Sequence, residues 1–332
     1  MPNAKFIERV GLTFKRADNG FVPPKDDMVS RSILPLFAHY QGGEFQMVGV
    51  GWIVATFGQT AVMLTAKHVF DEVVQKSTHP RSHSTALKEF LPAPPPQRHH
   101  KASIYALWPL PDGTTETLAI MASAWHGKDF DVSACCVCLR DNAPKDLVFS
   151  DRFAIDSSPQ KIGTPVAVIG FTNIKFDCTV DNATKTMVAN ISYKSEARHG
   201  MITEVYKQQG TSCPHPGFRT NISIDSGMSG SPVFSKADPK SWKVCGIASK
   251  DISTESSNMV KGSGESFVSE LWPAMRIALP TDLSGAKRDA KKISLLEMER
   301  LRQIDDIARA SEHLFETEDK SASLDFHGAE FP

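Results

Sequence analysis

Short apolar runs, broken by glycine, proline and polar residues, recur along most of this chain and constrain its fold more than any other feature. Between residues 32 and 70 they include ILPLFAHY, QMVGVGWIVAT and TAVMLTAKHVF, with Phe57-Gly58-Gln59 placed as a hairpin turn between the last two. Similar runs return at intervals of roughly 8–12 residues. The chain shows neither an alternation of strand and helix patterns nor a fixed-period repeat. We therefore expect an all-β protein, a barrel or a sandwich.

The predicted strands fall into two series, separated by a less regular stretch at 140–160. The first series closes with VSACCVCL, and the second opens with TPVAVIGF. We therefore expect a first domain over residues 29–145 and a second over 146–283, preceded by a polar N-terminal arm, 1–28. The segment 76–101 contains three consecutive prolines and no periodicity, so it is predicted to be a loop insertion.

The segment 286–320 differs from the rest because Ala, Leu, Glu, Lys and Arg dominate it. An apolar stripe at helical spacing predicts an amphipathic helix of about six turns. Mixed charges disfavour membrane binding, and the irregular stripe disfavours a coiled coil. We expect a C-terminal extension, 284–332, that a chain ending near Leu283 can lose without unfolding. Its helix is expected either to pack loosely on the second barrel, exposed to solvent, or to bind a protein partner or a second copy of the chain.

Net charge and hydropathy argue against two classes of partner. With 37 Lys and Arg against 38 Asp and Glu, the net charge is -1, which gives no electrostatic basis for binding nucleic acid or an anionic membrane. The sequence begins without the apolar core of a signal peptide and has no run of about 18 apolar residues. We therefore expect a cytoplasmic protein.

Six cysteines in 332 residues are too few for a disulfide scaffold. Three of them, Cys135, Cys136 and Cys138, share one apolar strand, in which neighbours point to opposite faces and cannot easily pair. A zinc site would need a second pair of ligands at fixed spacing, which the sequence lacks. We expect buried free thiols in a reducing compartment, and neither a metal nor an organic cofactor.

Three short segments carry residue types that nucleophilic catalysis uses. In LTAKHVF an apolar strand ends at His68, and in DFDVSACCV another begins at Asp131, with Asp129 as a competitor for the same place. In DSGMSGSPVF, Ser229 is flanked by glycines, the first of them Gly227, so a tight turn can gather backbone N–H groups beside the serine oxygen. Each segment alone also has a structural explanation, such as a strand-end histidine or a β-turn.

In chain order these residues are His68, Asp131 and Ser229, the three elements of a nucleophilic triad. A serine hydroxyl is a poor nucleophile at its free pKa and needs a base. Histidine suits that work because its unperturbed pKa lies near neutrality. A buried carboxylate would fix the histidine tautomer and stabilise the imidazolium. The expected chemistry is therefore acylation at Ser229 followed by hydrolysis.

These segments and three others resemble the trypsin-like serine peptidases of chymotrypsin fold, in the style of the bacterial high-temperature-requirement and glutamyl-endopeptidase branches. TAKHVF, DVSACCV and GMSGSPVF resemble the blocks around the family's histidine, aspartate and serine. VGVGWI resembles the strand before the histidine, GTPVAVIGF the strand that opens the second barrel, and VCGIAS the strand after the nucleophile. The resemblance covers about residues 30–280. It implies two six-stranded antiparallel β-barrels with an active site between them.

The resemblance also implies a role for each matching residue. His68 matches the general base, Asp131 the carboxylate that orients it, and Ser229 the nucleophile. The backbone N–H groups of Gly227 and Ser229 match the oxyanion hole, and Ser249 matches a hydroxyl that supports the aspartate. Asp131 is preferred to the aspartate two positions earlier because the apolar residues after it follow in the family's phase.

Two departures from the family pattern lie beside the nucleophile. Met228 stands where digestive enzymes carry an aspartate that pairs with a newly cut N-terminus, so activation by cleavage is not expected. Ser231 replaces the second glycine of the motif, as in bacterial and viral members. For specificity, Ser223 matches the base of the primary pocket, and Ala248 stands where acid-specific members place a histidine. We therefore expect a preference for a small or medium apolar side chain.

Two other functions fit the same residues. A peptidase-fold binding or scaffold module with little turnover would agree with the lack of a signal sequence and with the charged C-terminal segment. An intact His-Asp-Ser set argues against it. An esterase would use the same triad on a different bond. The expected function is a serine endopeptidase, and the expected substrate is a protein or peptide.

Overall fold

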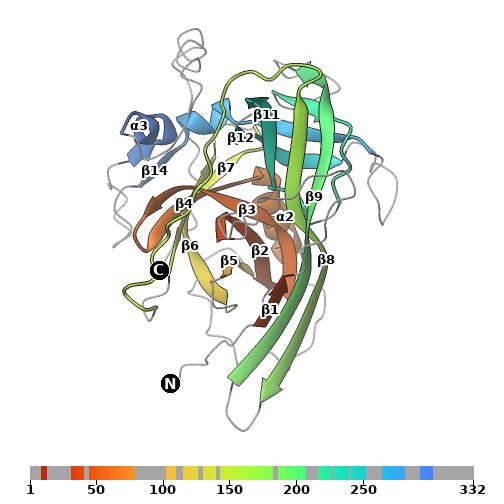
Figure 1. Ribbon diagram of the computed structural model, residues 1–332. Coiled ribbons are helices and arrows are strands. Elements are labelled where there is room, and N and C mark those ends of the chain that lie inside the picture. The colour runs from red at the N-terminus through yellow and green to blue at the C-terminus, as the bar shows by residue number, and fades with distance from the viewer. Residues whose placement is uncertain are drawn as a thin grey trace.

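The computed structural model (Figure 1) places two β-barrels side by side. It describes residues 9–12, 31–40, 45–78, 102–109, 115–125, 130–139, 143–181, 186–206, 216–225, 227–238, 241–251, 264–280 and 292–301. Within these ranges no helix is long and apolar enough to cross a bilayer.

The first barrel is closed by antiparallel strands in the order β2-β3-β4-β7-β6-β5. The six strands are β2 (Ile33–Tyr40), β3 (Phe45–Phe57), β4 (Thr60–Thr65), β5 (Ala102–Pro109), β6 (Thr115–Trp125) and β7 (Ser133–Cys138). Each of the apolar runs predicted in this half contributes one strand. The β3–β4 hairpin turns at Gly58-Gln59 as predicted, and Gly58 has a φ of 63°, a conformation that favours glycine.

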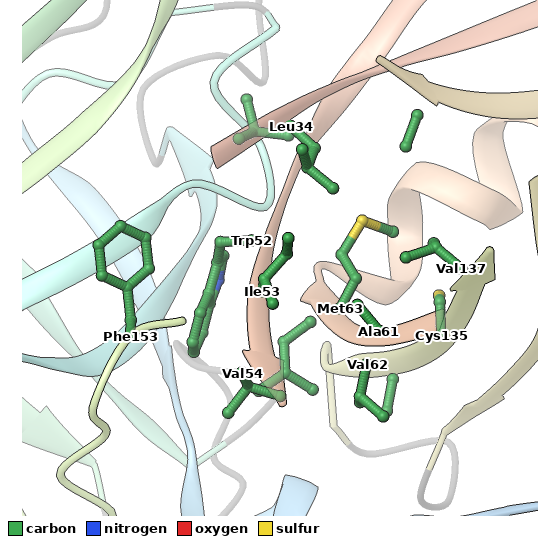
Figure 2. Close-up of a cluster of buried hydrophobic side chains, with 14 of the residues drawn as sticks. Leu34, Trp52, Ile53, Val54, Ala61, Val62, Met63, Cys135, Val137 and Phe153 are labelled. Carbon is green, nitrogen blue, oxygen red and sulfur yellow. The ribbon is translucent and has the colours of Figure 1, made fainter. Parts of the chain in front are cut away.

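Apolar side chains that point inward from these strands fill the first barrel (Figure 2). Ile53 of β3 and Met63 of β4 lie on the same side of the sheet as Val137 of β7, and all three are buried. Trp52 lies on the opposite side of β3 and faces Phe153, with ring centroids 6.3 Å apart. Full burial of a large apolar side chain stabilises a fold by about 1.5–3 kcal/mol. The inner face therefore holds the barrel closed, and the outer face of β3 packs against the rest of the protein.

The cysteines that the structure describes are free, and they behave as small apolar residues. Cys135, Cys136 and Cys245 are buried, and Cys138 is half-buried. Burial raises the pKa of Cys136 to about 12. Burial also raises the pKa of Cys135 and Cys245, so these three buried thiols stay protonated at neutral pH, which agrees with the packing role expected of them.

The second barrel closes in the order β9-β10-β13-β12-β11-β8, with β8 paired again to β9. Its strands are β8 (Pro165–Asp181), β9 (Thr186–Tyr206), β10 (Gly217–Thr220), β11 (Pro232–Asp238), β12 (Ser241–Asp251) and β13 (Ser266–Glu270). The predicted pair of six-stranded antiparallel barrels is confirmed. β8 and β9 each combine two predicted runs, and β10 was not predicted because its four residues, GFRT, show no clear alternation.

β8 and β9 continue beyond the second barrel as a long hairpin (Figure 1). A short strand, β1 (Arg9–Leu12), lies parallel to β9 along this hairpin, in register with Asn190 to Tyr193. β1 falls within the segment expected to be an N-terminal arm. It joins the edge of the sheet, and the other residues of that arm lie outside the described ranges.

A helix that was not predicted, α2 (Lys67–Thr78), follows directly after β4. The sequence analysis continued the apolar run through His68 and began the loop insertion at residue 76, whereas the structure ends the strand at Thr65. Val69 and Val73, one helical turn apart, are both buried. Lys67 forms an i,i+4 ion pair with Asp71 at 2.6 Å. Residues 76–78 of the expected insertion 76–101 therefore belong to α2, and residues 79–101 lie outside the described ranges.

The segment 143–164 connects the barrels and is bonded to both. The N–H of Phe153 donates to the carbonyl of Ile53 on β3 at 3.0 Å, and the N–H of Asp156 donates to that of Val244 on β12 at 2.8 Å. The ring of Phe153 also meets Phe234 of β11 edge to face, with centroids 5.1 Å apart. One hydrophobic cluster consequently contains residues from the connection and from both barrels.

After the second barrel the chain packs back onto this shared cluster. The short helix η2 (Trp272–Arg276) leads into β14 (Ala278–Pro280), which pairs with β15 (Lys292–Ser294), and α3 (Leu295–Arg300) follows. The described part of the expected 286–320 helix is thus a strand followed by a helix of six residues. Residues beyond 301 lie outside the described ranges.

The burial of Leu295 and Met298 changes what we expect of a truncated chain. Both side chains belong to the shared cluster, and the N–H of Leu295 donates to the carbonyl of Ile277 at 3.0 Å. A chain ending near Leu283 loses both side chains, so we now expect it to be destabilised. A chain ending after Leu301 keeps them.

We predict that Leu295→Ala lowers the free energy of unfolding by about 2–5 kcal/mol, because it leaves a cavity in the shared cluster. The matched control is Leu301→Ala, since Leu301 is 58% exposed, and we expect it to change stability by less than about 0.5 kcal/mol. Urea denaturation followed by circular dichroism measures both. Equal effects of the two substitutions would contradict the assignment of Leu295 to the core.

Candidate active site

The residues proposed for catalysis lie in a chain of contacts where the two barrels meet. His68 comes from the first turn of α2, and Asp131 lies just before β7. Ser249 is on β12, and Ser229 lies in the turn that leads into β11. Asp129, the competitor of Asp131, lies outside the described residues.

The carboxylate of Asp131 holds His68 through two bonds. Its Oδ1 accepts the backbone N–H of His68 at 2.8 Å, and its Oδ2 lies 2.7 Å from the ring Nδ1. A carboxylate can only accept here, so Nδ1 carries the proton and Nε2 is left as the basic nitrogen. The same Oδ2 accepts the hydroxyl of Ser249. These three bonds fix the orientation and the tautomer of the imidazole.

Burial and charge act in opposite directions on this pair. Burial alone would lower the pKa of His68, but the hydrogen bond and negative charge of Asp131 outweigh it and raise that pKa above its usual value. Burial alone would raise the pKa of Asp131, but His68 and the Ser249 hydroxyl hold it below its usual value. At neutral pH the carboxylate is therefore ionised and can stabilise an imidazolium.

Ser229 is fixed through its backbone, while its hydroxyl makes a weaker bond. Its carbonyl accepts the N–H of Val50 on β3 at 2.8 Å, a bond that joins the two barrels. Its Oγ donates to the carbonyl of Ser249 at 3.4 Å. Ser249 therefore contacts both Asp131 and Ser229. Between the described residues no hydrogen bond joins the Ser229 hydroxyl to His68, so the two are connected only through Ser249 and Asp131.

The glycines beside Ser229 allow the backbones of the two barrels to approach closely. A Cβ added to Gly230 would lie 2.0 Å from the carbonyl oxygen of Val50 and 2.4 Å from Oγ1 of Thr65. A Cβ added to Gly49 would lie 2.7 Å from the carbonyl oxygen of Ser229. The sequence analysis explained the glycines by N–H groups that converge on the serine. The structure adds a second reason, which is that no side chain fits between β3 and the nucleophile turn.

The turn before Ser229 contains the two backbone N–H groups, of Gly227 and Ser229, that were predicted to bind an oxyanion. The N–H of Met228 donates to the carbonyl of Asp225 at 3.0 Å, and Gly227, at the third position of this turn, has a φ of 92°. A positive φ at the third position is the feature of a type II turn and favours glycine. Among the backbone bonds between described residues, the N–H groups of Gly227 and Ser229 donate to no carbonyl. Both are thus available to a ligand oxygen.

Met228 points away from the candidate site into the interior of the second barrel. Its side chain is fully buried in the second hydrophobic cluster, and a Cβ on Gly170 would lie 2.9 Å from its Cε. An apolar side chain in this place forms no ion pair with an amine. That the protein needs no activating cleavage stays a prediction.

The two residues proposed for a specificity pocket lie on either side of the nucleophile turn. Ser223 is half-buried, and its carbonyl accepts a bond from Nη1 of Arg198 at 2.7 Å. Ala248 is fully buried in the second cluster, and its N–H donates to the carbonyl of Ser231 at 2.9 Å. Their role in substrate choice stays a prediction. Arg198 was not singled out in the sequence, because it lies on β9, outside every motif.

Nowhere in the described ranges do three or more His, Cys, Asp or Glu side chains form a group able to hold a metal ion. The polar residues of the candidate site are instead paired with one another.

We predict that Gly230→Ala destabilises the protein more than Gly163→Ala does. Both glycines have a positive φ, 88° and 82°, so both substitutions impose backbone strain, which costs about 1–2 kcal/mol. A Cβ at Gly163 meets nothing within 4 Å, whereas one at Gly230 meets the backbone of β3. The difference between the two losses of unfolding free energy, measured by urea denaturation, gives the cost of the steric clash between a Cβ at Gly230 and β3. Equal values would show that β3 and the nucleophile turn do not touch as described.

The sequence profile of the trypsin-like peptidase domain matches residues 49–247 of this chain. No curated protein matches the chain. Among solved structures, human heparin binding protein is 11% identical, with 74% of this chain and 88% of that chain covered and a TM-score of 0.39. An inactive serine-to-alanine mutant of a protein from M. tuberculosis H37Rv is 12% identical, with 78% and 90% covered and a TM-score of 0.39. Kallikrein-related peptidase 10 is 12% identical, with 74% and 92% covered and a TM-score of 0.39.

Proposed function

We propose that this chain, which belongs to the trypsin-like peptidase domain family, is a serine endopeptidase that uses His68, Asp131 and Ser229. The observation that supports this best is the buried Asp131 carboxylate, which holds both the backbone N–H and the ring Nδ1 of His68. A structural histidine needs only one such partner. The double contact, together with Ser249 on the same carboxylate, orients the basic Nε2 in the way that general-base catalysis requires.

The proposed reaction begins when the Ser229 hydroxyl turns from the Ser249 carbonyl towards His68. Its proton passes to Nε2 while Oγ attacks the carbonyl carbon of the scissile peptide bond. The oxygen of that carbonyl becomes negative and is stabilised by the N–H groups of Gly227 and Ser229. The imidazolium, stabilised by Asp131, then gives its proton to the leaving amine as the C–N bond breaks.

The second half of the reaction repeats these steps with water. Nε2 of His68 removes a proton from the water, whose oxygen attacks the ester carbonyl of the acylated Ser229. The same two N–H groups bind the oxyanion, and the imidazolium returns the proton to Oγ as the ester bond breaks. A carboxylic acid leaves and the free enzyme is restored. A protein or peptide is the proposed substrate, and the preference for a small or medium apolar side chain remains a prediction.

We predict that a fluorophosphonate probe labels the wild-type protein and fails to label Ser229→Ala. The matched control is Ser231→Ala in the same turn, because Ser231 Oγ is buried and has no hydrogen-bond partner among the described residues. Its removal should leave labelling close to that of the wild type. Fluorescence of the labelled band on a gel measures all three proteins, and equal labelling of wild type and Ser229→Ala would falsify the assignment of the nucleophile.

We further predict that Asp131→Asn lowers kcat/KM by about 10⁴-fold, the loss typical of a triad that has lost its carboxylate. The sign of the accompanying pH shift also follows from the structure. Burial lowers the pKa of His68 and Asp131 raises it, so without the Asp131 carboxylate burial is opposed only by the smaller effects of the Glu72 and Asp71 charges. The midpoint of the rising limb of kcat/KM against pH should therefore move to lower pH. A midpoint that stays in place or rises would contradict the pairing of His68 with Asp131.

The proposal also concerns activation. Since Met228 is buried and binds no amine, the chain should react with the probe without any N-terminal trimming. If Ser229→Ala kept peptide binding and the full biological effect, a scaffold role would be favoured over the enzyme. An ester substrate that is cleaved while amides are not would favour an esterase.

A further inference from the structure

A second group of charged side chains lies beside the nucleophile turn, and none of the steps above uses it. At its centre is the guanidinium of Arg198 on β9. Nη1 donates to the backbone carbonyl of Ser223 at 2.7 Å, and Nη2 bonds to the carboxylate of Asp225 at 2.5 Å. Nε donates to Glu196 at 3.2 Å. All three nitrogens of the guanidinium therefore have partners. Two of these partners, Ser223 and Asp225, lie shortly before the nucleophile Ser229 in the chain.

The ion pair between Arg198 and Asp225 is partly shielded from water, and a further hydrogen bond holds the guanidinium in place. The side chains of Arg198 and Asp225 are 19% and 30% exposed, so the pair is less screened than a fully exposed ion pair. Glu196 accepts a further bond from Thr172 on β8 at 3.2 Å, which ties the guanidinium to two strands of the barrel wall. Planar, forked recognition of this kind suits arginine and is lost with lysine. The contact with Arg198 therefore fixes the direction of the Asp225 side chain.

Asp225 is the residue from which the turn before Ser229 begins. Its carbonyl accepts the N–H of Met228, and Gly227 lies between them. On the far side of the turn, backbone bonds hold the chain, since Ser229 accepts from Val50 and Gly230 donates to Ala248 at 2.8 Å. In the chain just before the turn, Arg198 bonds to Ser223 and Asp225, and Ile224 between them is buried, so both contacts hold this segment. A shift of Asp225 would therefore change the direction in which the Gly227 N–H points.

We infer that Arg198 is a positioning residue, which holds Ser223 and Asp225 so that the turn presents the N–H of Gly227 to the substrate's carbonyl oxygen. The catalytic consequence rests on the proposed peptidase function, whereas the effect on the turn does not. In this chain Arg198 provides the charged contact that holds the turn, because Met228 is buried in the core of the second barrel and carries no charge.

The test compares Arg198→Met and Asp225→Asn with a matched control, Arg219→Met. Arg219 lies on the adjacent strand β10, and its side chain is 22% exposed. It forms an ion pair with Glu204 at 3.3 Å and packs over the ring of Tyr206. Arg219 therefore matches Arg198 in burial and in having a carboxylate partner, and neither Glu204 nor Tyr206 belongs to the nucleophile turn.

We expect Arg198→Met and Asp225→Asn each to lower kcat by about 10- to 100-fold, since a misplaced N–H stabilises the oxyanion poorly. KM should change by less than about threefold. The double variant should be no worse than Arg198→Met alone, because that substitution already removes the contact with Asp225. Arg198→Lys should recover only part of kcat, as lysine keeps the charge without the fork. Arg219→Met should keep the wild-type kcat.

Hydrogen exchange separates this inference from the proposed function. The peptide covering residues 221–231 should exchange faster in Arg198→Met and Asp225→Asn than in the wild type, while it should be unchanged in Arg219→Met. Unchanged exchange in both turn variants overturns the positioning role, whatever the activity. Faster exchange with an unchanged kcat overturns its link to the oxyanion site. If the wild type does not react with the fluorophosphonate, the peptidase assignment fails, and exchange still decides whether Arg198 holds the turn.

Discussion

The carboxylate of Asp131 is 5% exposed and receives hydrogen bonds from both barrels. Taking an ion out of water costs several kcal/mol unless its lone pairs are satisfied, and an unpaired buried carboxylate is strongly destabilising. Here the donors are the backbone N–H and ring of His68, from α2 of the first barrel, and the hydroxyl of Ser249, from β12 of the second. The carboxylate is therefore satisfied only when both barrels are in place. This requirement couples the folding of the protein to the assembly of the candidate site.

The nucleophile turn depends on the same boundary, but through backbone contacts. Val50 of β3 donates to the carbonyl of Ser229, and the missing side chains of Gly49 and Gly230 let the two chains approach. Side chains could adapt to small displacements of one barrel relative to the other, whereas backbone contacts at this distance cannot. The position of Ser229 is thus set by the packing of the whole boundary, including the ring of Phe153 between Trp52 and Phe234.

Much of this arrangement could be predicted because its signals are local. Short apolar runs predicted the strands of both barrels except β10, and glycine at fixed positions predicted the turns around Gly58 and Ser229. Helix α2 was missed because the run around Val69 is short and apolar, and such runs fit a strand as well as a helix. The core position of Leu295 depends on where the chain returns after the second barrel. Periodicity within the segment cannot show this.

Arg198 illustrates a further limit of the sequence. Its partners in the nucleophile turn, Ser223 and Asp225, are 25 and 27 residues away along the chain, and no spacing rule relates them. They meet because β9 passes beside the turn after the barrel has closed. His68, Asp131 and Ser229 are even further apart, yet each lies in a segment whose own composition is informative. The residues proposed to catalyse were therefore visible in the sequence, while the residue proposed to position the nucleophile turn was not.

The most direct test of the account is a crystal structure of the protein after reaction with a phosphonate. The account predicts a single adduct on Oγ of Ser229. One phosphoryl oxygen should lie about 2.7–3.1 Å from the backbone nitrogens of Gly227 and Ser229. The Ser229 side chain should have left the Ser249 carbonyl, and His68 should still be bonded to Asp131. An adduct on another residue, or one whose phosphoryl oxygen faces solvent while His68 is detached from Asp131, would contradict it.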